Sequence, residues 1–276
     1  LFHVAVDLFH TDTTAYADIV LPAASFLEFN DLVLSYFDLT LSAQAKACDP
    51  LGEALSNHEI FRRLARAMGY NDPGLFESEA HLIDRLLAQT LYRGSFADLA
   101  KAGTTTLFAE PRLQFADLNF ATPSGRIELA SDRAVELGLP RAPTPHADER
   151  PEPGLLRIIS PASAWQMNSS YGNDAVIRRR LGPPTVTLHP EDAAAGGFLE
   201  GDAVVLINET GRLPLAVTIS PAAQPGVGIV YKGRWPSASD DDANVNVLVA
   251  GRKSDLAEST AVHSTVVRLE RAEIRR

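Results

Sequence analysis

HPEDAAAGGFLEGDAVVLINETGRLPLAVTI, residues 189–219, decides the fold of the second half of the chain. It opens with a predicted short helix, because Pro190 suits a first helical position and the two acidic residues after it suit the positive end of a helix. Two apolar stretches follow, at 203–208 and 213–220, with a Gly turn between them. This order predicts a helix followed by two strands.

The surrounding residues extend this β pattern. Four further apolar stretches of strand length are separated by Gly, Pro and Asp turns: LLRIIS at 155–160, TVTLH at 185–189, GIVYKG at 228–233 and STVVRLE at 264–270. Several short strands within about 115 residues imply a closed barrel or a sandwich.

A proline-rich segment precedes these strands. PRAPTPHADERPEP, residues 140–153, has five prolines and no apolar period, which is typical of a linker. Proline donates no ladder hydrogen bond, so this segment is not expected to be a central strand. We therefore predict two domains, residues 1–139 and 154–276, joined by residues 140–153.

The first domain reads as α/β in character. Residues 1–7 form a predicted buried strand ending on Asp7, a Thr-rich loop follows, and the apolar run 19–21 is a second short strand. The strand at residues 1–7 has no lead-in, so we expect the chain to begin inside a larger fold. Ser56, three residues before a Glu, predicts the start of a helix, and a second helix is expected over about 77–88.

The segment 107–130 looks extended. Within it, LNFATPSGRIELAS predicts a hairpin whose turn is Pro123-Ser124-Gly125.

Composition excludes several classes of function. The 276 residues carry a formal net charge of −10, which argues against a broad nucleic-acid or anionic-membrane surface. No run approaches the length of a membrane span. The single cysteine, Cys48, excludes an internal disulfide and a cysteine-ligated zinc or iron–sulfur site, and we expect it to be a small buried hydrophobe. The histidine spacing matches no metal motif, so no metal site is predicted.

Two segments resemble the molybdopterin oxidoreductases. AVDLFHTDTTAYADIVLPAASFLE, residues 5–28, resembles the family stretch in which an aspartate and a Thr-rich loop precede an A-D-x-V-L-P block. Residues 189–219 resemble its C-terminal dinucleotide-binding domain, with P-E-D-A and G-D-x-V in the same order, and VNVL at 245–248 lies downstream. The resemblance is to the dimethyl sulfoxide reductase, formate dehydrogenase and nitrate reductase group.

The resemblance implies a fold and a role. It implies that the first domain is the C-terminal portion of a Rossmann-like α/β domain and that the second is an all-β six-stranded double-psi barrel. It implies a molybdenum or tungsten atom on two molybdopterin guanine dinucleotides, with the metal ligand and any 4Fe-4S cluster upstream of this chain. No catalytic residue is then expected here, and this chain alone is expected to be inactive. The expected partners are upstream domains of the same polypeptide and an electron-transfer subunit.

The residues expected to touch the cofactor lie in both domains. Asp7 ends a strand where α/β folds bind a nucleotide ribose, and its carboxylate can also accept two hydrogen bonds from guanine; a loop cap is the alternative. Asn57 stands where some relatives have a nucleotide-contacting aspartate, although helix capping beside Ser56 explains it better. Phe29 stands where some relatives carry lysine, so a phosphate contact is lost there. Arg178 to Arg180 are expected to form a solvated face, with use by a partner subunit or domain as the alternative.

The loop SPASAWQMNSSYG, residues 160–172, is expected to wrap the pterin and its pyrophosphate with backbone N–H groups and neutral donors. A merely polar barrel loop is the alternative. Asn246 and His263 are implied by the resemblance as further contacts, with a β-turn role open for Asn246. The loop residues assigned to the cofactor are Ser160, Pro161, Ala162, Ser163, Trp165, Gln166, Met167, Asn168 and Ser169.

Two functions from different classes remain open. The first is the cofactor-holding part of a molybdopterin-dependent oxidoreductase. The second is a non-catalytic scaffold subunit of the same fold in a respiratory complex. An intact polar loop at 160–172, together with Asp7 and Asn246, favours the first, because a scaffold has no reason to keep all of them.

Overall fold

The computed structural model describes residues 1–144, 150–238, 243–254 and 258–272. The chain divides into two compact units, Leu1–Ile127 and Glu128–Arg276. This division lies before the proline-rich segment 140–153, part of which falls outside the described residues, so the linker stays a prediction. Among the described residues no helix combines the length and the apolar character that a membrane crossing requires.

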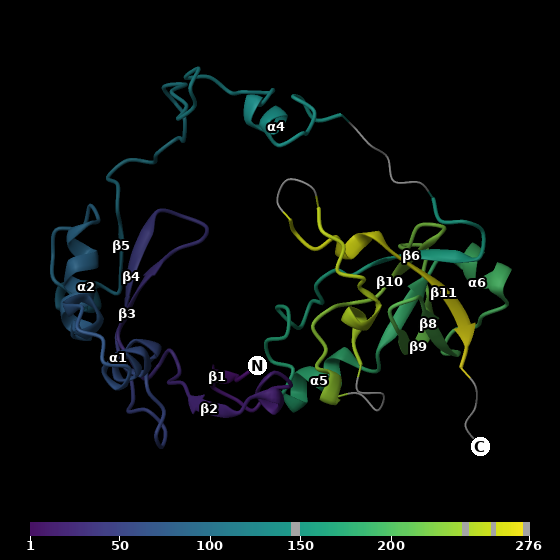
Figure 1. Cartoon of the computed structure of the whole chain (residues 1–276), viewed down its shortest axis with the longest axis horizontal. Coiled ribbons are helices and arrows are strands. Elements are labelled where there is room, and N and C mark those ends of the chain that lie inside the picture. The colour runs from purple at the N-terminus through teal and green to yellow at the C-terminus, as the bar shows by residue number, and fades with distance from the viewer. Residues whose placement is uncertain (145–149, 239–242, 255–257, 273–276) are drawn as a thin grey trace. The chain divides into compact units, whose positions relative to one another are not determined.

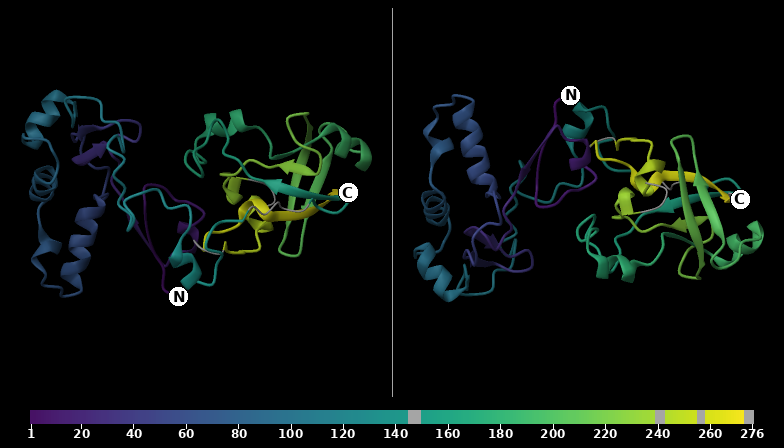
Figure 2. Two further views of the ribbon diagram at one scale, coloured as in Figure 1. Left: turned by 90° about the horizontal axis from the view of Figure 1, so that it is seen from above. Right: turned by 90° about the horizontal axis from the view of Figure 1, so that it is seen from below.

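The second unit is built on a closed barrel of six strands (Figures 1 and 2). Around the barrel the order is β10-β6-β11-β8-β9-β7. Two neighbouring pairs are parallel, β10 with β6 and β7 with β9, and the remaining pairs are antiparallel. The strands are β6 Leu155–Ile159, β7 Thr185–Leu188, β8 Ala203–Ile207, β9 Arg212–Ile219, β10 Val227–Ile229 and β11 Thr265–Arg271. The closed barrel is confirmed, and its mixed pairing fits the expected double-psi type.

The barrel closes around one apolar core. Along β6, β7 and β9 every second residue is buried, as the two-residue period of a strand requires when one face is covered. Burial of this apolar surface is the main favourable term in forming the unit. The fully buried side chains include Ile158, Val186, Leu188, Val204, Leu206, Leu248 and Val267.

Helices of the second unit begin at polar caps. The predicted helix is α6, Pro190–Gly196, and Gly197 ends it in the left-handed conformation at φ 68°. A helix that was not expected, α5, spans Ala175–Leu181, because the Asp174 carboxylate accepts the first free backbone N–H groups. Short 3-10 turns and the helix α4 complete the unit: α4 Asp132–Glu136, and turns at Pro236–Ala238, Val245–Leu248 and Val262–Ser264.

The first unit mixes α and β elements. Its strands β1 and β2 form a parallel pair, and β3, β4 and β5 form an antiparallel sheet. Leu41 of β4 packs with residues of α2 and α3 in a small core. The elements are β1 Val4–Asp7, β2 Ile19–Pro22, β3 Asp31–Leu34, β4 Thr40–Gln44, β5 Thr104–Thr106, α1 Asn57–Ala67, α2 Glu79–Ala88 and α3 Phe96–Ala102, with 3-10 turns at Thr14–Tyr16 and Pro73–Phe76.

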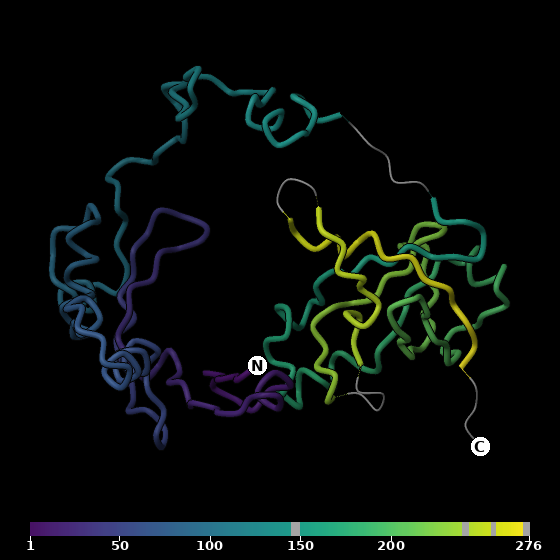
Figure 3. The backbone as a smooth tube through the Cα atoms, in the orientation of Figure 1, coloured from purple at the N-terminus to yellow at the C-terminus, as the bar shows by residue number. Residues whose placement is uncertain are grey.

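The hairpin predicted after residue 107 is wrong. The turn exists, since Gly125 N donates to Thr122 O at 3.0 Å, but no strand flanks it. Thr122 Oγ1 accepts from Arg126 N and donates to Arg126 O, so the groups that a ladder would use are satisfied locally. Leu118 at φ 53° is not extended. The irregular path of this stretch can be followed in Figure 3.

The expectation that Cys48 is buried is also wrong. The residue is exposed, and its thiol lies 3.8 Å from the carbonyl oxygen of Leu27. It lies in a loop after β4, and loops run over the surface because their backbone groups need water or polar partners.

Candidate functional site

The polar loop 160–172 leaves the barrel at the end of β6. At its start the Ser160 backbone N–H donates to His263 Nδ1 at 3.4 Å, so two residues predicted from distant parts of the sequence are neighbours. Pro161 O accepts from Lys232 N at 3.1 Å, which continues the β6–β10 pairing by one step. Ser163 Oγ then accepts from the backbone N–H groups of Trp165 and Gln166 at 3.3 and 3.0 Å. The loop is therefore held in one conformation from its first residue.

A second segment, Gly233 to Trp235, fixes the other half of the loop. Gln166 Nε2 donates to Gly233 O at 3.3 Å, and Trp235 Nε1 donates to Ser169 O at 2.7 Å. Gly233 has φ +100°, and a Cβ built on it would lie 2.0 Å from Asn168 O. Only glycine permits this contact, because a side chain would collide with loop backbone.

Cations line two adjoining cavities beside this loop. A cavity of about 150 Å³ is lined by Gln166, Lys232 and Arg234 among others, and one of about 310 Å³ by Gln166, Arg178 and Arg234. No Asp or Glu is among the described residues that line either cavity. In a chain of net charge −10, this local surplus of positive charge suits an anionic ligand.

Arg234 is anchored by carbonyl groups at the end of α5. Its Nη2 donates to Leu181 O, Gly182 O and Pro183 O at 3.1, 2.9 and 3.1 Å. A cation is favourable at this helix end because the macrodipole is negative there. Burial lowers the pKa of the guanidinium from its ordinary value. An anion in the cavity would stabilise the charged form of the guanidinium and so offset the effect of burial.

Gln166 carries an unused acceptor. Its side chain is 5% exposed, and Oε1 has no hydrogen-bond partner among the described residues. Leaving a buried carbonyl oxygen unpaired costs about 1–3 kcal/mol, so such an atom in a native fold calls for a partner. Because Gln166 lines both cavities, an N–H or O–H group of a molecule bound there would satisfy this acceptor.

Most of the remaining residues predicted in the second unit do not line these cavities. Asn246 is exposed and lines neither cavity, whereas Asn244 lines one and donates to Arg234 O at 2.9 Å. The exposed loop side chains include Trp165, which packs under the Arg180 guanidinium at 4.4 Å. The other exposed or partly buried loop residues assigned from sequence are Pro161, Ala162, Met167, Asn168 and Ser169.

Sequence reasoning missed the cations. Lys232 and Arg234 flank Gly233 directly after an apolar strand. Two positive charges around a glycine in an acidic chain were the sequence feature that could have indicated an anion site. The triplet Arg178 to Arg180 is exposed, as expected of a solvated face. In addition, Arg178 lines a cavity and Arg180 covers Trp165, which the sequence did not predict.

A separate cavity in the first unit gathers the other predicted residues. It measures about 610 Å³ and is lined by Asp7, Ser56 and Asn57, which the fold of β1 and α1 brings together. Asp7 Oδ1 accepts from the N–H groups of Leu8 and Phe9 at 2.7 and 3.4 Å, so the carboxylate is oriented by its own turn. Ser56 Oγ accepts from Glu59 N, which confirms the cap of α1.

The charge of this first cavity is opposite to that of the barrel cavities. Asp7, Asp31 and Glu79 line it, and no Lys or Arg does among the described residues. It therefore suits a neutral group rich in hydrogen-bond donors, such as a nucleobase or a sugar, better than a phosphate. The neighbouring threonines are occupied elsewhere, since Thr11 and Thr14 hydrogen-bond to each other.

Among the described residues, the barrel unit carries a polar loop beside cavities that are lined by cations and by no carboxylate. The first unit carries its own cavity, which is lined by carboxylates. Each of these cavities suits a small molecule of matching charge. The molydopterin dinucleotide binding domain matches residues 156–266, and the molybdopterin oxidoreductase family matches residues 2–67. The chain belongs to the molybdopterin oxidoreductase family, in the group of the dimethyl sulfoxide reductases.

Relatives of known name agree with this assignment. The probable oxidoreductase YoaE of Bacillus subtilis is 32% identical over 98% of this chain, and a putative dimethyl sulfoxide reductase catalytic subunit of Halobacterium salinarum is 31% identical over 98%. The solved acetylene hydratase of Pelobacter acetylenicus shares the fold with a TM-score of 0.80 at 21% identity over 98% of this chain. The chain spans 40%, 34% and 40% of these three proteins.

Proposed function

We propose that this chain is the C-terminal, cofactor-holding portion of a molybdenum or tungsten oxidoreductase that uses two molybdopterin guanine dinucleotides. The observation that carries the proposal is the buried Gln166 Oε1, which has no partner among the residues that the structure describes, in cavities lined by Arg178, Lys232 and Arg234. The substrate is left open, because among the similar proteins one is named a dimethyl sulfoxide reductase and another an acetylene hydratase.

The residues present fit such a cofactor. A pterin ring offers N–H groups to the Gln166 acceptor, and the pyrophosphate suits the cationic cavities and the backbone N–H groups of the loop. When bound, the cofactor supplies the metal at which electrons are exchanged. The chain's own residues bind it and orient it. We assign Ser160, Gln166 and Asn168 to the pterin end; of these three, Gln166 lines the cationic cavities and the other two do not.

In the first unit we assign Asp7 to the guanine end. A carboxylate accepts from both N1–H and N2–H of guanine, and Asn57 in the same cavity adds one donor and one acceptor. We propose that β1 and β2 belong to a larger Rossmann-like sheet, because a parallel pair of four residues each is too small to be stable by itself. Upstream domains of the same polypeptide would supply the other strands.

The same proposal covers the remaining components. The metal ligand and a 4Fe-4S cluster belong to the upstream domains, and an electron-transfer subunit is a further partner. This chain alone is expected to show no oxidoreductase turnover, and activity of the isolated, metal-reconstituted chain with formate or nitrate would contradict that expectation.

Replacing Ser160, Gln166 and Asn168 together with alanine in the full-length enzyme tests the proposal. Each lost neutral hydrogen bond costs about 0.5–1.5 kcal/mol, so cofactor retention is expected to weaken about 10-fold or more. Guanine nucleotide released by acid extraction and metal content measure retention. The Asp7→Asn variant, which places a donor against guanine, is expected to lower both quantities as well.

Exposed amides outside both sites provide the control. Gln89→Ala with Asn119→Ala is expected to leave the nucleotide and metal content unchanged. If the triple variant and Asp7→Asn also retain wild-type content at unchanged melting temperatures, the non-catalytic scaffold function replaces the cofactor-holding one.

A further inference from the structure

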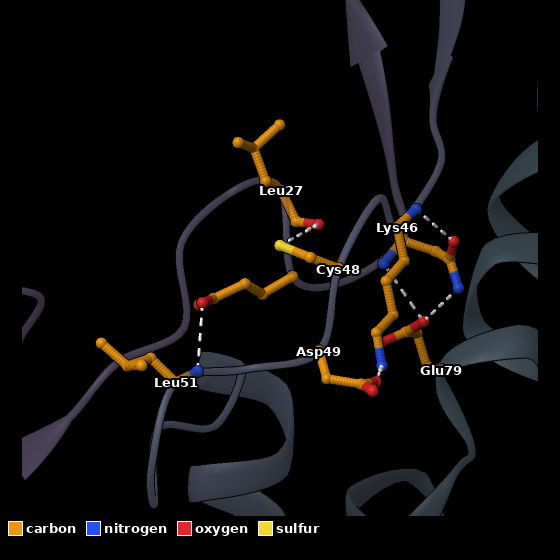
Figure 4. A network of polar contacts seen from close by, with 8 residues as sticks. Leu27, Lys46, Cys48, Asp49, Leu51 and Glu79 are labelled. Atoms are coloured by element: carbon orange, nitrogen blue, oxygen red, sulfur yellow. Dashed lines mark hydrogen bonds and ion pairs between the residues drawn. The ribbon is translucent and has the colours of Figure 1, made fainter.

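The loop from Ser25 to Asn30, which follows β2, is fixed by hydrogen bonds of Ser25, Leu27, Glu28 and Asn30, the residues on either side of its two phenylalanines. Leu27 O accepts from the backbone N–H groups of Ala47 and Cys48 at 2.8 and 3.2 Å. The Glu28 carboxylate accepts from Ser25 N at 2.7 Å and from Leu51 N at 3.1 Å. Figure 4 shows the Leu27, Cys48 and Leu51 side of this network.

The end of the loop is fixed as firmly. Asn30 Oδ1 accepts from Lys46 N at 2.9 Å, and Asn30 Nδ2 donates to Glu79 Oε1 at 2.8 Å, which ties the loop to the start of α2. Lys46 and Glu79 are labelled in Figure 4. Lys46 in turn pairs with Asp49 at 2.7 Å. The backbone positions of Phe26 and Phe29, which lie between these anchors, are therefore set before any ligand arrives.

Both phenylalanines line the cavity that holds Asp7. Phe26 is 63% exposed, so its ring faces open space without covering the core of the unit. The cavity of about 610 Å³ is in the size range of small-molecule sites and combines aromatic rings with a few oriented polar groups, as such sites do.

We propose that Phe26 and Phe29 form an aromatic wall that stacks on the nucleobase whose edge Asp7 recognises. The inference rests on the proposed function, and it assigns to Phe29 a contact with the base instead of a phosphate. Every base has a π-face, so stacking contributes affinity without choosing between bases. Asp7 supplies the choice, because guanine presents two donors to a carboxylate and adenine does not.

The proposal can be tested because the rings and the carboxylate have different roles: the rings add affinity for any base, and Asp7 selects guanine. Guanosine and adenosine are titrated into the full-length enzyme freed of its cofactor, and their dissociation constants are measured by ligand-observed NMR. Phe29→Leu is expected to weaken both nucleosides about fivefold or more and by the same factor, because it removes the ring and keeps an apolar side chain. Phe29→Tyr, which keeps the ring, is expected to bind both like the wild type.

Two further variants complete the experiment. Asp7→Asn is expected to weaken guanosine and leave adenosine unchanged. Phe37→Leu, at a phenylalanine that is 94% exposed and does not line this cavity, is expected to change neither.

The outcomes separate the two proposals. Equal binding by the wild type and Phe29→Leu, with guanosine still weakened by Asp7→Asn, overturns the aromatic wall and leaves the cofactor-holding function standing. Absence of guanosine binding to the wild-type, cofactor-free enzyme overturns the nucleobase site, and the wall with it. Loss of guanosine alone in Phe29→Leu also overturns the wall, because stacking does not select a base.

Discussion

Replacing Gly233 with alanine is expected to displace the 160–172 loop and to lower the free energy of unfolding of the second unit by about 2–5 kcal/mol. Two effects combine at this position. The φ of +100° is strained for any residue with a side chain, and the new Cβ would lie 2.0 Å from Asn168 O and 2.8 Å from Asn168 C. Because both of these atoms are backbone, no rotamer change relieves the contact, and the loop itself has to move.

Intrinsic fluorescence reports this displacement directly. The chain has two tryptophans, and both contact or belong to the 160–172 loop. Trp235 donates to Ser169 O, and Trp165 packs under Arg180. Tryptophan emission of Gly233→Ala is therefore expected to shift in the folded state. In the full-length enzyme the same variant is expected to retain about 10-fold less cofactor, because Gln166 loses its bond to Gly233 O.

Gly226→Ala is the matched control. It has φ +79°, and a Cβ there would meet no atom within 4 Å, so the variant carries backbone strain without a collision. We expect it to cost about 1–2 kcal/mol and to leave tryptophan emission unchanged. Equal destabilisation and equal emission in the two variants would show that the loop does not rest on Gly233.

The barrel strands were predictable because their signal is local. The strand at 213–220 alternates buried and partly buried side chains, and that period is visible in any window of the sequence. Closure was not predictable from the residues alone, since it depends on Ile229 of β10 pairing with Thr187 of β7. Apolar strands of the same period build a sandwich equally well.

The candidate site shows the same division. The loop 160–172 was predictable from its hydroxyls and amides, and Asp7 from its place after a strand. The contacts of Gly233 with Asn168 and of Trp235 with Ser169 join residues far apart in the chain, so no local sequence pattern predicts them. The failed hairpin has a related cause, because the Thr122 hydroxyl bonds the backbone N–H and C=O of Arg126, which a second strand would otherwise have used.

Replacing Leu206 with alanine is expected to lower the free energy of unfolding of the barrel by about 2–5 kcal/mol. Leu206 is 0% exposed, and β8 lies between β11 and β9, where Leu206 pairs with Leu269 and Leu213. The closed ring of strands limits how far the neighbours can move inward, so the space left by the side chain stays largely empty. The cost therefore includes lost burial and a cavity.

Chemical denaturation followed by tryptophan fluorescence measures this cost for the second unit alone, since Trp165 and Trp235 both belong to Glu128–Arg276. Leu199→Ala removes the same atoms from a side chain that is 69% exposed in the same unit, and it is expected to change stability by less than about 0.5 kcal/mol. If the two variants are destabilised equally, the interior of the barrel is loosely packed. A loosely packed barrel would not hold the loop and its cations in one geometry, so the cofactor-holding function would lose its structural basis together with the core.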